Sequence, residues 1–304
     1  MSAQNDSVRR LTVVDIAKLH ADGTRIATIT AYDYPTAALV DEAGIPLILV
    51  GDSLAQVVLG YDTTVRVSMD EMLHHTRAVV RGTKRALVVA DMPFLSYSNA
   101  EDALVNAGRF LRDGGAQAVK VEGGVRSARV IEALVRAGIP VMGHIGLTPQ
   151  AINTLGRVRV QGKSKDQARS LLADALAVQE AGAFSVVLEL VPGQLAQAIT
   201  DRLHIPTIGI GAGAGCSGQI QVINDTLGWG DWVPRHARKY ADLRGTILGA
   251  IERYRADIEA GTFPGADETV LMDPAVLDDV LGRSGADQAE SRGALMGIPL
   301  DRDL

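Results

Sequence analysis

Cysteine is almost absent from this sequence. Cys216 is the only cysteine among 304 residues, so neither an intrachain disulfide nor a cysteine-based zinc cluster can form. The residue lies in a glycine-rich stretch without an obvious activating partner. We therefore interpret it as a small loop residue rather than as a catalytic nucleophile.

Strong positive charge and long apolar runs are missing as well. The formal net charge is −6 and no block of lysine and arginine reaches five in a row, so nucleic acid is not an expected partner. The first fifteen residues lack the continuous apolar core of a signal peptide, and no uninterrupted apolar run approaches the length of a membrane span. We expect a cytoplasmic protein that makes no membrane contact.

The residues that are present favour one large globular domain. Hydrophobic residues make up 47% and charged residues 22% of the chain, which allows a sizeable buried core and excludes disorder throughout. A length of 304 residues exceeds the usual single-domain size but fits one α/β barrel.

Short apolar, β-branched runs alternate with longer segments of helical spacing, a pattern typical of βα units around a parallel sheet. The runs are apolar on both faces, as strands buried in such a sheet must be. Eight strands are expected, at residues 25–33, 46–52, 86–93, 118–124, 140–146, 185–192, 206–213 and 220–225. Eight such repeats predict an α/β fold of the barrel type.

Helices are expected between these strands, at residues 34–43, 68–81, 100–112, 127–136, 165–180 and 193–202. Ser68 and Ser127 suit N-terminal caps, and Ala-Gly pairs such as Ala137-Gly138 suit left-handed C-terminal caps. A leading helix at 12–20 would cover the bottom of the barrel, and 242–259 would form its last helix.

The chain changes character after Pro264. Residues 265–304 are polar and rich in aspartate and glycine, with one helix signal at Asp273-Pro274, because an acidic N-cap followed by proline suits a helix start. We predict one catalytic barrel domain over residues 1–264. The C-terminal extension, 265–304, is predicted to be peripheral and partly mobile.

Four predicted strands end on carboxylates, at Asp52, Asp91, Glu122 and Glu189. Active sites of α/β barrels lie at the C-terminal ends of the strands. Three of these acids belong to successive strands and would repel one another unless a cation lies between them. All-oxygen ligation favours Mg²⁺, with Mn²⁺ or Co²⁺ as substitutes. The alternative is that each carboxylate caps the following helix.

Two further residues of this region could contact a substrate. Lys120 lies two residues before Glu122, on the same face of one strand, where it could hold an oxyanion or form a structural ion pair. Ser53 follows Asp52 directly and could donate a hydrogen bond to a substrate carboxylate or cap the next helix.

Glu189 stands between leucines, an environment that should raise the pKa of its carboxyl toward the range of a general base. Pairing with a buried base is the alternative. His144 also follows a strand, but a lone histidine is more often a core residue. His74 and His75 are adjacent on a helix and cannot share a metal. The glycine-rich stretch 209–218 gives a weak phosphate-site signal.

These residues stand in motifs that resemble the ketopantoate hydroxymethyltransferase family over about residues 12–264. The motifs, in order, are TAYDYPTA, LVGDSLAQVVLGYDTT, HTRAVVRG, VADMPFLSY, VKVEGG, PVMGHIGLTPQ, VQGKS, LELVP and IGIGAGAGCSGQI. The resemblance implies a TIM (β/α)8 barrel, a cytoplasmic homo-oligomer that is typically a decamer, Mg²⁺ or a similar ion, and the substrates 3-methyl-2-oxobutanoate and 5,10-methylenetetrahydrofolate.

The resemblance also implies roles for the individual residues. Asp52 and Asp91 would ligate the metal, and Glu122 would complete or support that site. Ser53 and Lys120, together with Asp52 and Asp91, would bind the oxo acid. Glu189 would be the proton acceptor.

The sequence departs from the family in the loops that border the site. Gly156-Arg157-Val158 stands where the family has Gly-Gly-aromatic, Ser217 replaces an acidic residue, and Asn224 replaces a frequent histidine. One alternative is a lyase or mutase of the phosphoenolpyruvate and isocitrate lyase type, but its KKCGH-like loop is missing. A barrel without catalytic activity is the other alternative.

Overall fold

The computed structural model describes residues 9–283 of the chain. By their contacts these residues divide into two compact units, one ending at Ala241 and the other beginning at Asp242. Each unit is described by itself.

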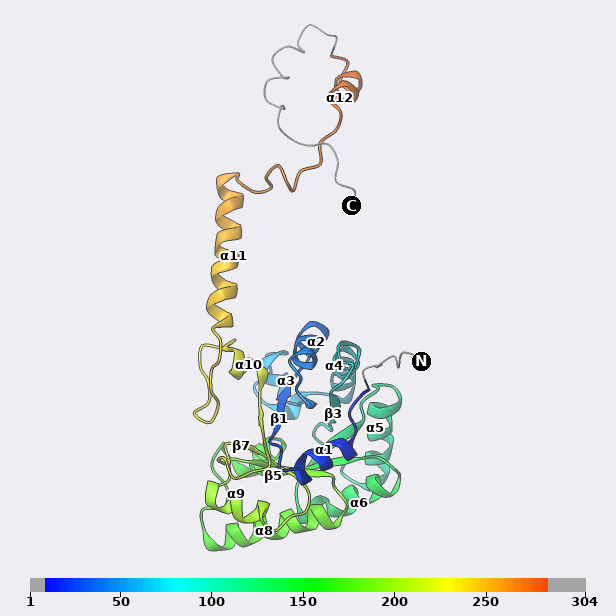
Figure 1. Cartoon of the computed structure of the whole chain (residues 1–304), viewed down its shortest axis with the longest axis vertical. Helices are drawn as coiled ribbons and strands as arrows, with labels where there is room; N and C mark the ends of the chain where they lie inside the picture. The colour runs from blue at the N-terminus through cyan, green and yellow to red at the C-terminus, as the bar shows by residue number, and fades with distance from the viewer. Residues whose placement is uncertain (1–8, 284–304) are drawn as a thin grey trace, which may run out of the picture. The chain divides into compact units, whose positions relative to one another are not determined.

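The first unit is a closed barrel of eight parallel strands in sequence order, which confirms the predicted fold class (Figure 1). Each strand pairs with the next, and β8 pairs with β1 in parallel. The strands are β1 (Ile26–Thr30), β2 (Leu47–Val50), β3 (Leu87–Asp91), β4 (Ala118–Glu122), β5 (Val141–Gly146), β6 (Ser185–Glu189), β7 (Thr207–Ile210) and β8 (Gly218–Gln221).

Alternation along each strand separates two apolar layers. Leu47 and Leu49 of β2 belong to an inner cluster to which all eight strands contribute. Ile48 and Val50, their neighbours in β2, belong to an outer cluster that also includes helix residues. Polar residues at inward positions therefore lie inside the barrel, where burial makes them costly unless they have partners.

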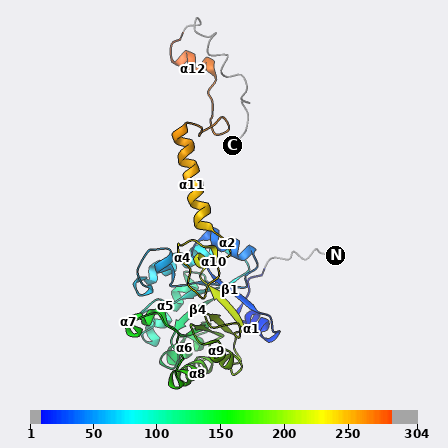
Figure 2. The same ribbon diagram turned by 90° about the vertical axis from the view of Figure 1, so that its left-hand side faces the viewer.

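Helices surround the strands (Figure 2). They are α1 (Val13–Ala21), α2 (Tyr34–Glu42), α3 (Leu54–Val57), α4 (Met69–Gly82), α5 (Ala100–Arg112), α6 (Ala128–Arg136), α7 (Ile152–Leu155), α8 (Lys165–Glu180), α9 (Gly193–Thr200) and α10 (Ile223–Leu227). Three short 3₁₀ turns are η1 (Thr64–Arg66), η2 (Val125–Ser127) and η3 (Pro149–Ala151). None of the described helices is long and apolar enough to span a membrane.

Helix α1 covers the bottom of the barrel, as predicted. Its buried Ile16 joins the inner cluster beside Ile26 of β1 and Leu47 of β2, residues at the N-terminal ends of their strands. The opposite end of the barrel is left open to the loops that follow the strands.

Local details confirm some predicted caps and correct others. Ser68 forms a capping box with Glu71 at the start of α4, and Gly138 takes the left-handed conformation with φ 84°. Ser127 does not cap α6, because its hydroxyl donates instead to the carbonyl oxygen of Glu122 at 2.8 Å. The strand predicted at 220–225 was also misplaced: β8 ends at Gln221, and α10 begins two residues later.

The second unit contains α11 (Leu243–Ala260) and α12 (Pro274–Val280). Asp273 caps α12 by accepting from the backbone N–H of Ala275 at 2.9 Å, as predicted. A helix was also predicted at 242–259 and is present, but its contacts group it with the following residues rather than with the barrel unit. Most of the predicted mobile extension, residues 284–304, lies outside the described residues.

Candidate active site at the barrel mouth

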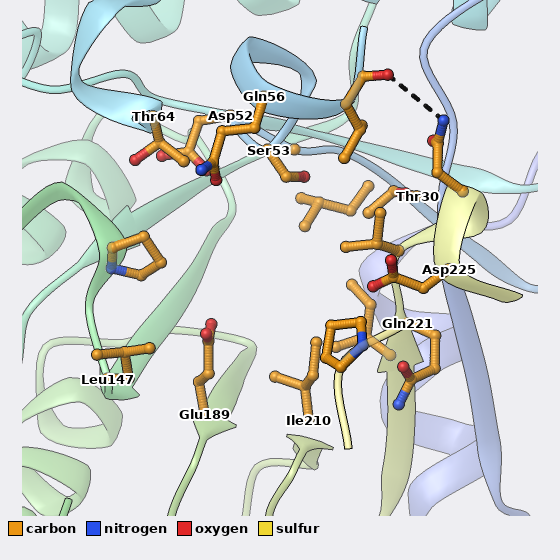
Figure 3. A pocket seen from close by; sticks show the side chains of 18 of the residues that line it. Thr30, Asp52, Ser53, Gln56, Thr64, Leu147, Glu189, Ile210, Gln221 and Asp225 are labelled. Atoms are coloured by element: carbon orange, nitrogen blue, oxygen red, sulfur yellow. Dashed lines mark hydrogen bonds between the residues drawn. The ribbon is translucent and has the colours of Figure 1, made fainter. Parts of the chain in front are cut away.

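The C-terminal ends of the strands surround a cavity of about 650 Å³ (Figure 3). Its lining includes most of the residues predicted for the site: Asp52, Ser53, Asp91, Lys120 and Glu189. Glu122 does not line the cavity but is buried directly beside it, at 2% exposure. The side chains predicted from the ends of the strands therefore lie together at one end of the barrel.

Lys120 lies at the centre of the buried charges. Its Nζ is 2.8 Å from Asp91 Oδ1 and 4.0 Å from Glu122 Oε1, and all three side chains are nearly inaccessible to water. Burial lowers the pKa of Lys120, but Asp91, Glu122 and Asp52 outweigh it and raise that pKa above its usual value. Lys120 therefore carries a fixed positive charge in the mouth of the barrel.

Gln150 connects two of the acids. Its Nε2 donates to Asp52 Oδ2 at 2.9 Å and to the carbonyl oxygen of Met92 at 3.0 Å. Its backbone N–H donates to Glu122 Oε2 at 3.1 Å, and its own Oε1 accepts from the hydroxyl of Tyr97 at 2.6 Å. With every polar group of this side chain engaged, its orientation is fixed, and so are the two carboxylates that it binds.

The pKa values of the three carboxyls are shifted in different directions, because burial, the neighbouring acids, His144 and Lys120 act on each of them to a different extent. Burial, together with Asp91 and Glu122, raises the pKa of Asp52 well above its usual range. Burial also raises the pKa of Asp91, against the opposing charge of Lys120. Burial acts in the same direction on Glu122, but His144 and Lys120 outweigh it and lower that pKa. Of the three acids, Asp52 is therefore the one whose negative charge is least compensated by neighbouring positive charge.

The donor types suit a hard divalent cation. Three carboxylates face one ammonium, and Glu122 Oε1 is buried without a hydrogen bond from the described residues. Asp52 and Asp91 are linked directly, because the backbone N–H of Asp52 donates to Asp91 Oδ2 at 3.0 Å.

A ready-made coordination sphere is not present, however. Within residues 9–283, no three acidic, histidine or cysteine side chains are arranged so that they could hold a metal ion. In the structure, Lys120 binds an oxygen of Asp91 and Gln150 binds an oxygen of Asp52. The residue types fit the chemistry of the ion, and ligation would use the remaining carboxylate oxygens together with some movement of Lys120.

Glu189 and His144 form the opposite side of the charged cluster. His144 Nε2 lies 3.1 Å from Glu189 Oε2, and His144 Nδ1 lies 2.9 Å from Lys120 Nζ. Burial and Lys120 lower the pKa of His144, whereas the carboxylates of Glu122 and Glu189 act in the opposite direction. Yet an imidazolium would point a second donor at the Lys120 ammonium. We therefore assign the proton to Lys120 and a neutral ring, with Nε2–H facing Glu189, to His144.

Ser53 lines the cavity beside Asp52, and its hydroxyl is 2.8 Å from the hydroxyl of Tyr32. It precedes the short helix α3 without forming a side-chain cap. The alternative prediction, that the Ser53 side chain caps the next helix, is thus wrong. The hydroxyl of Ser53 is instead held by its hydrogen bond with the hydroxyl of Tyr32.

Residue patterns pointed to the carboxylates and the lysine but missed three polar partners. His144 was interpreted as a core histidine, and it is buried at 3% exposure, but between Lys120 and Glu189. Its position at the end of a predicted strand was the available signal. Gln150 and Tyr97 carried no such signal, because neither ends a predicted strand: Gln150 lies in η3 and Tyr97 in a turn. His75 lies outside this cluster and contacts the carbonyl oxygen of Tyr32 at 2.6 Å.

Comparison with known proteins gives matches over nearly the whole chain. The family model described as ketopantoate hydroxymethyltransferase matches residues 10–266. The 3-methyl-2-oxobutanoate hydroxymethyltransferase of Chloroflexus aurantiacus is 61% identical over 274 residues, which cover 90% of this chain and 97% of that protein. The enzyme of the same name from Dehalococcoides mccartyi is 54% identical over 273 residues, 89% of this chain and 98% of that protein.

Two solved structures with a similar fold are much more distant in sequence. Phosphoenolpyruvate phosphomutase from Streptomyces platensis subsp. rosaceus gives a TM-score of 0.57 at 18% identity, covering 93% of this chain and 100% of that chain. A 2,3-dimethylmalate lyase gives a TM-score of 0.53 at 17% identity, covering 93% and 99%. Identities this low show the shared barrel fold alone.

Proposed function

The chain belongs to the ketopantoate hydroxymethyltransferase family, and on that basis we propose that the cluster at the barrel mouth carries out the reaction of the family. The activity is transfer of a hydroxymethyl group to 3-methyl-2-oxobutanoate, a step of pantothenate biosynthesis. The lyase and mutase alternative shares only the fold with this chain. The proposal concerns the metal, the one-carbon donor and the role of each residue.

The observation that carries the proposal is the division of charge inside one cavity. Asp52, Asp91 and Lys120 line one part of it, and Glu189 lines another. A 2-oxo acid has an anionic end, which needs positive charge, and a C3–H bond, which needs a base. Both requirements can be met by side chains that line this one cavity.

Asp52 and Asp91 would ligate Mg²⁺, or Mn²⁺ or Co²⁺ in its place, and Glu122 would support that site from its bonds to Gln150. When bound, such an ion polarises the carboxylate and 2-oxo oxygens of the substrate and so acidifies C3. Ser53 donates a hydrogen bond to the substrate carboxylate. Lys120 stabilises the negative charge that develops on the 2-oxo oxygen.

Glu189 accepts the proton from C3, and the resulting enolate carbon forms a bond to the one-carbon unit of the donor. We propose 5,10-methylenetetrahydrofolate as that donor. Both bonds from its one-carbon unit to nitrogen break, the two nitrogens take up the C3 proton and one proton of water, and the remaining hydroxide of that water becomes the hydroxyl group. The products are then 2-dehydropantoate and tetrahydrofolate. The Nε2–H of His144, 3.1 Å from Glu189 Oε2, orients the carboxylate of Glu189 toward the cavity.

We further propose that the protein is cytoplasmic and forms a homo-oligomer, a decamer as the resemblance to the family implies. We also propose that the catalytic domain spans residues 1–264 and that the extension spans residues 265–304. Apolar side chains on one face of α11 support self-association. Leu248, Ile251, Tyr254 and Ile258 are between 46% and 59% exposed, at a spacing that places them on one side of a helix.

The test is formation of 2-dehydropantoate by the purified full-length protein. The protein is first treated with EDTA, then supplied with 3-methyl-2-oxobutanoate, methylenetetrahydrofolate and Mg²⁺, Mn²⁺ or Co²⁺ in turn. We expect no product without metal and product with at least one of the three ions. Full activity after removal of metal would contradict the metal proposal. Absence of product when methylenetetrahydrofolate, free of added formaldehyde, is the donor would contradict the choice of donor.

A further inference from the structure

The cavity is larger than the oxo acid requires. About 650 Å³ is a volume that typically holds a ligand of drug size, whereas 3-methyl-2-oxobutanoate has only five carbon atoms. Figure 3 shows Asp225 and Gln221 on one wall of the cavity, with Glu189 and Leu147 toward the other side. The wall that contains Asp225 therefore has room for a second molecule.

The carboxylate of Asp225 receives no hydrogen bond from the part of the chain that the structure describes. The residue belongs to α10, the short helix after β8, and lines the cavity. Burial raises the pKa of Asp225, and the nearby His236 acts against that shift. A half-buried carboxylate in this state is stabilised by any ligand that offers N–H groups.

Two neighbouring amides also present acceptors. Gln221 Oε1 and Asn224 Oδ1 are buried without a hydrogen-bond partner among the described residues. The Nε2 of Gln221 donates to the carbonyl oxygen of His236 at 3.4 Å, and the Nδ2 of Asn224 donates to that of Val57 at 3.5 Å. In this arrangement the amide nitrogens face these carbonyl groups and the amide oxygens point away from them. We name Gln221, Asn224 and Asp225 the acceptor wall, because the Asp225 carboxylate lines the cavity and the two amide oxygens beside it receive no hydrogen bond from the described residues.

Aromatic surface lies next to the acceptor wall. Trp229 and Trp232 both line the cavity and are 51% and 75% exposed. Exposed indole rings at the rim of a cavity favour a flat ligand that can stack against them. The acceptor wall and the two tryptophans together would therefore bind a flat ring that carries N–H groups.

We propose that the acceptor wall binds the pterin ring of the one-carbon donor, with Asp225 accepting two hydrogen bonds, from the ring N–H and from the adjacent exocyclic amino group. The inference rests on the proposed function, because it assumes a folate-type donor. Repulsion by Asp225 directs the anionic glutamate tail of the donor away from this wall, toward solvent. The ring then brings its one-carbon unit to the side of the cavity that faces Glu189.

Tryptophan fluorescence can report on this binding directly. The sequence contains two tryptophans, and both lie at the rim of the cavity. Tetrahydrofolate is titrated into the full-length protein, with Mg²⁺ present, and quenching gives its dissociation constant after correction for absorbance. The same titration with a 2-desamino analogue measures the contribution of the exocyclic amino group. Binding of 3-methyl-2-oxobutanoate is measured separately by calorimetry.

We expect Asp225→Asn to raise the dissociation constant of tetrahydrofolate at least tenfold and to abolish the preference for tetrahydrofolate over the 2-desamino analogue. The dissociation constant of the oxo acid should stay within twofold. Asp62→Asn is the matched control, because Asp62 also lines the cavity but is exposed and ion-pairs with Arg66 at 3.6 Å. That variant should bind both ligands as the unmodified protein does.

Unchanged tetrahydrofolate binding in Asp225→Asn would overturn the proposal, as would an equal loss of affinity for the oxo acid, which would indicate a merely structural role. Retained discrimination against the 2-desamino analogue would overturn the assigned orientation of the ring. Failure of the unmodified protein to bind tetrahydrofolate at all would refute the folate donor of the proposed function, a result distinct from an effect at Asp225.

Discussion

Gln150 is an uncharged side chain that fixes two acids of the site at once. Its side chain binds Asp52, and its backbone binds Glu122. Tyr97 holds the other end of its amide. A residue of this kind touches neither substrate nor ion in the proposed mechanism, and it acts by positioning the carboxylates that do.

We predict that Gln150→Ala weakens activation by Mg²⁺. Without the amide, Asp52 loses a donor and can rotate away from Asp91, so the Mg²⁺ concentration for half-maximal activity should rise 10- to 100-fold, the range typical for partners of metal ligands. The measurement is product formation against Mg²⁺ concentration. As a control, Gln194→Ala, in an exposed position on α9, should leave the Mg²⁺ activation curve unchanged. If the Gln150→Ala curve coincides with the control curve, Gln150 does not position the metal-binding carboxylates.

The acids, the lysine and Ser53 could be predicted because each stands at or next to the end of an apolar run, where a barrel exposes its catalytic residues. Which acid pairs with which base could not be predicted, since it depends on the register between strands. Glu122 stands level with His144 across β4 and β5, and this register, invisible in a single sequence, makes His144 part of the cluster.

At the scale of secondary-structure elements, Asp41 connects one helix to the start of a strand. It lies in α2 and accepts from the backbone N–H groups of Lys84, Arg85 and Ala86, at distances between 2.6 and 3.2 Å. Burial opposes ionisation of Asp41, but these backbone bonds outweigh it and lower its pKa. The carboxylate therefore holds the turn that leads into β3.

We predict that Asp41→Ala lowers the free energy of unfolding by about 1–2 kcal/mol at pH 7, because three backbone donors lose a charged acceptor. A carboxyl whose folded pKa is depressed stabilises the protein above its unfolded pKa, about 3.9, and loses that contribution as the pH falls through the lower, folded value. Urea unfolding of both proteins from pH 7 downward should show the difference shrinking below about pH 4. A constant difference would contradict the account, and exposed Asp22→Ala serves as control.

Gly146 ends β5 where the strand passes closest to Glu189. Its φ is 94°, and an added Cβ would lie 2.2 Å from the backbone oxygen of Glu189. Gly146→Ala should therefore displace Glu189 and lower activity about 100-fold, as misplacement of a catalytic group by an ångström can. Gly138 has a similar φ of 84° with nothing near the added atom, so Gly138→Ala should lose stability only. Equal activity of the two variants would contradict the expectation.

Seven of the eight strands and most helices were predictable because apolar runs and helical spacing repeat regularly. The short elements were not. Residues 220–225 were predicted as one strand, yet β8 ends at Gln221 and Ile223 begins α10, and the polar Asn224 and Asp225 already interrupt the apolar run there. Ser127 read as a cap, but a tertiary bond to the carbonyl oxygen of Glu122 uses its hydroxyl.

At the scale of the whole molecule, α11 has no buried residue among its eighteen. A helix of this length with an apolar face is stabilised mainly by packing, not by its own propensity. The exposed apolar residues of α11 therefore favour contact with a second copy of the chain.

We predict that Ile251→Lys shifts the protein toward smaller species. Ile251 is 59% exposed at the middle of the apolar face of α11, and a charge there would have to be buried unpaired in an interface. Sedimentation velocity at several protein concentrations measures the change. Glu252→Lys, on the neighbouring exposed position, should keep the assembly of the unmodified protein; an unaltered distribution for Ile251→Lys would exclude this face from the interface.

The central claim is that Glu189 removes the C3 proton of the oxo acid in the metal-dependent cluster, and exchange of that proton tests it most directly. The full-length protein is incubated with Mg²⁺ and 3-methyl-2-oxobutanoate in D₂O without folate, and loss of the C3–H signal is followed by NMR. The account predicts exchange that requires metal, slows by about 10²- to 10⁴-fold in Glu189→Gln, and is unchanged in exposed Glu132→Gln. Undiminished exchange in Glu189→Gln, or no exchange in the unmodified protein at any metal concentration, would contradict it.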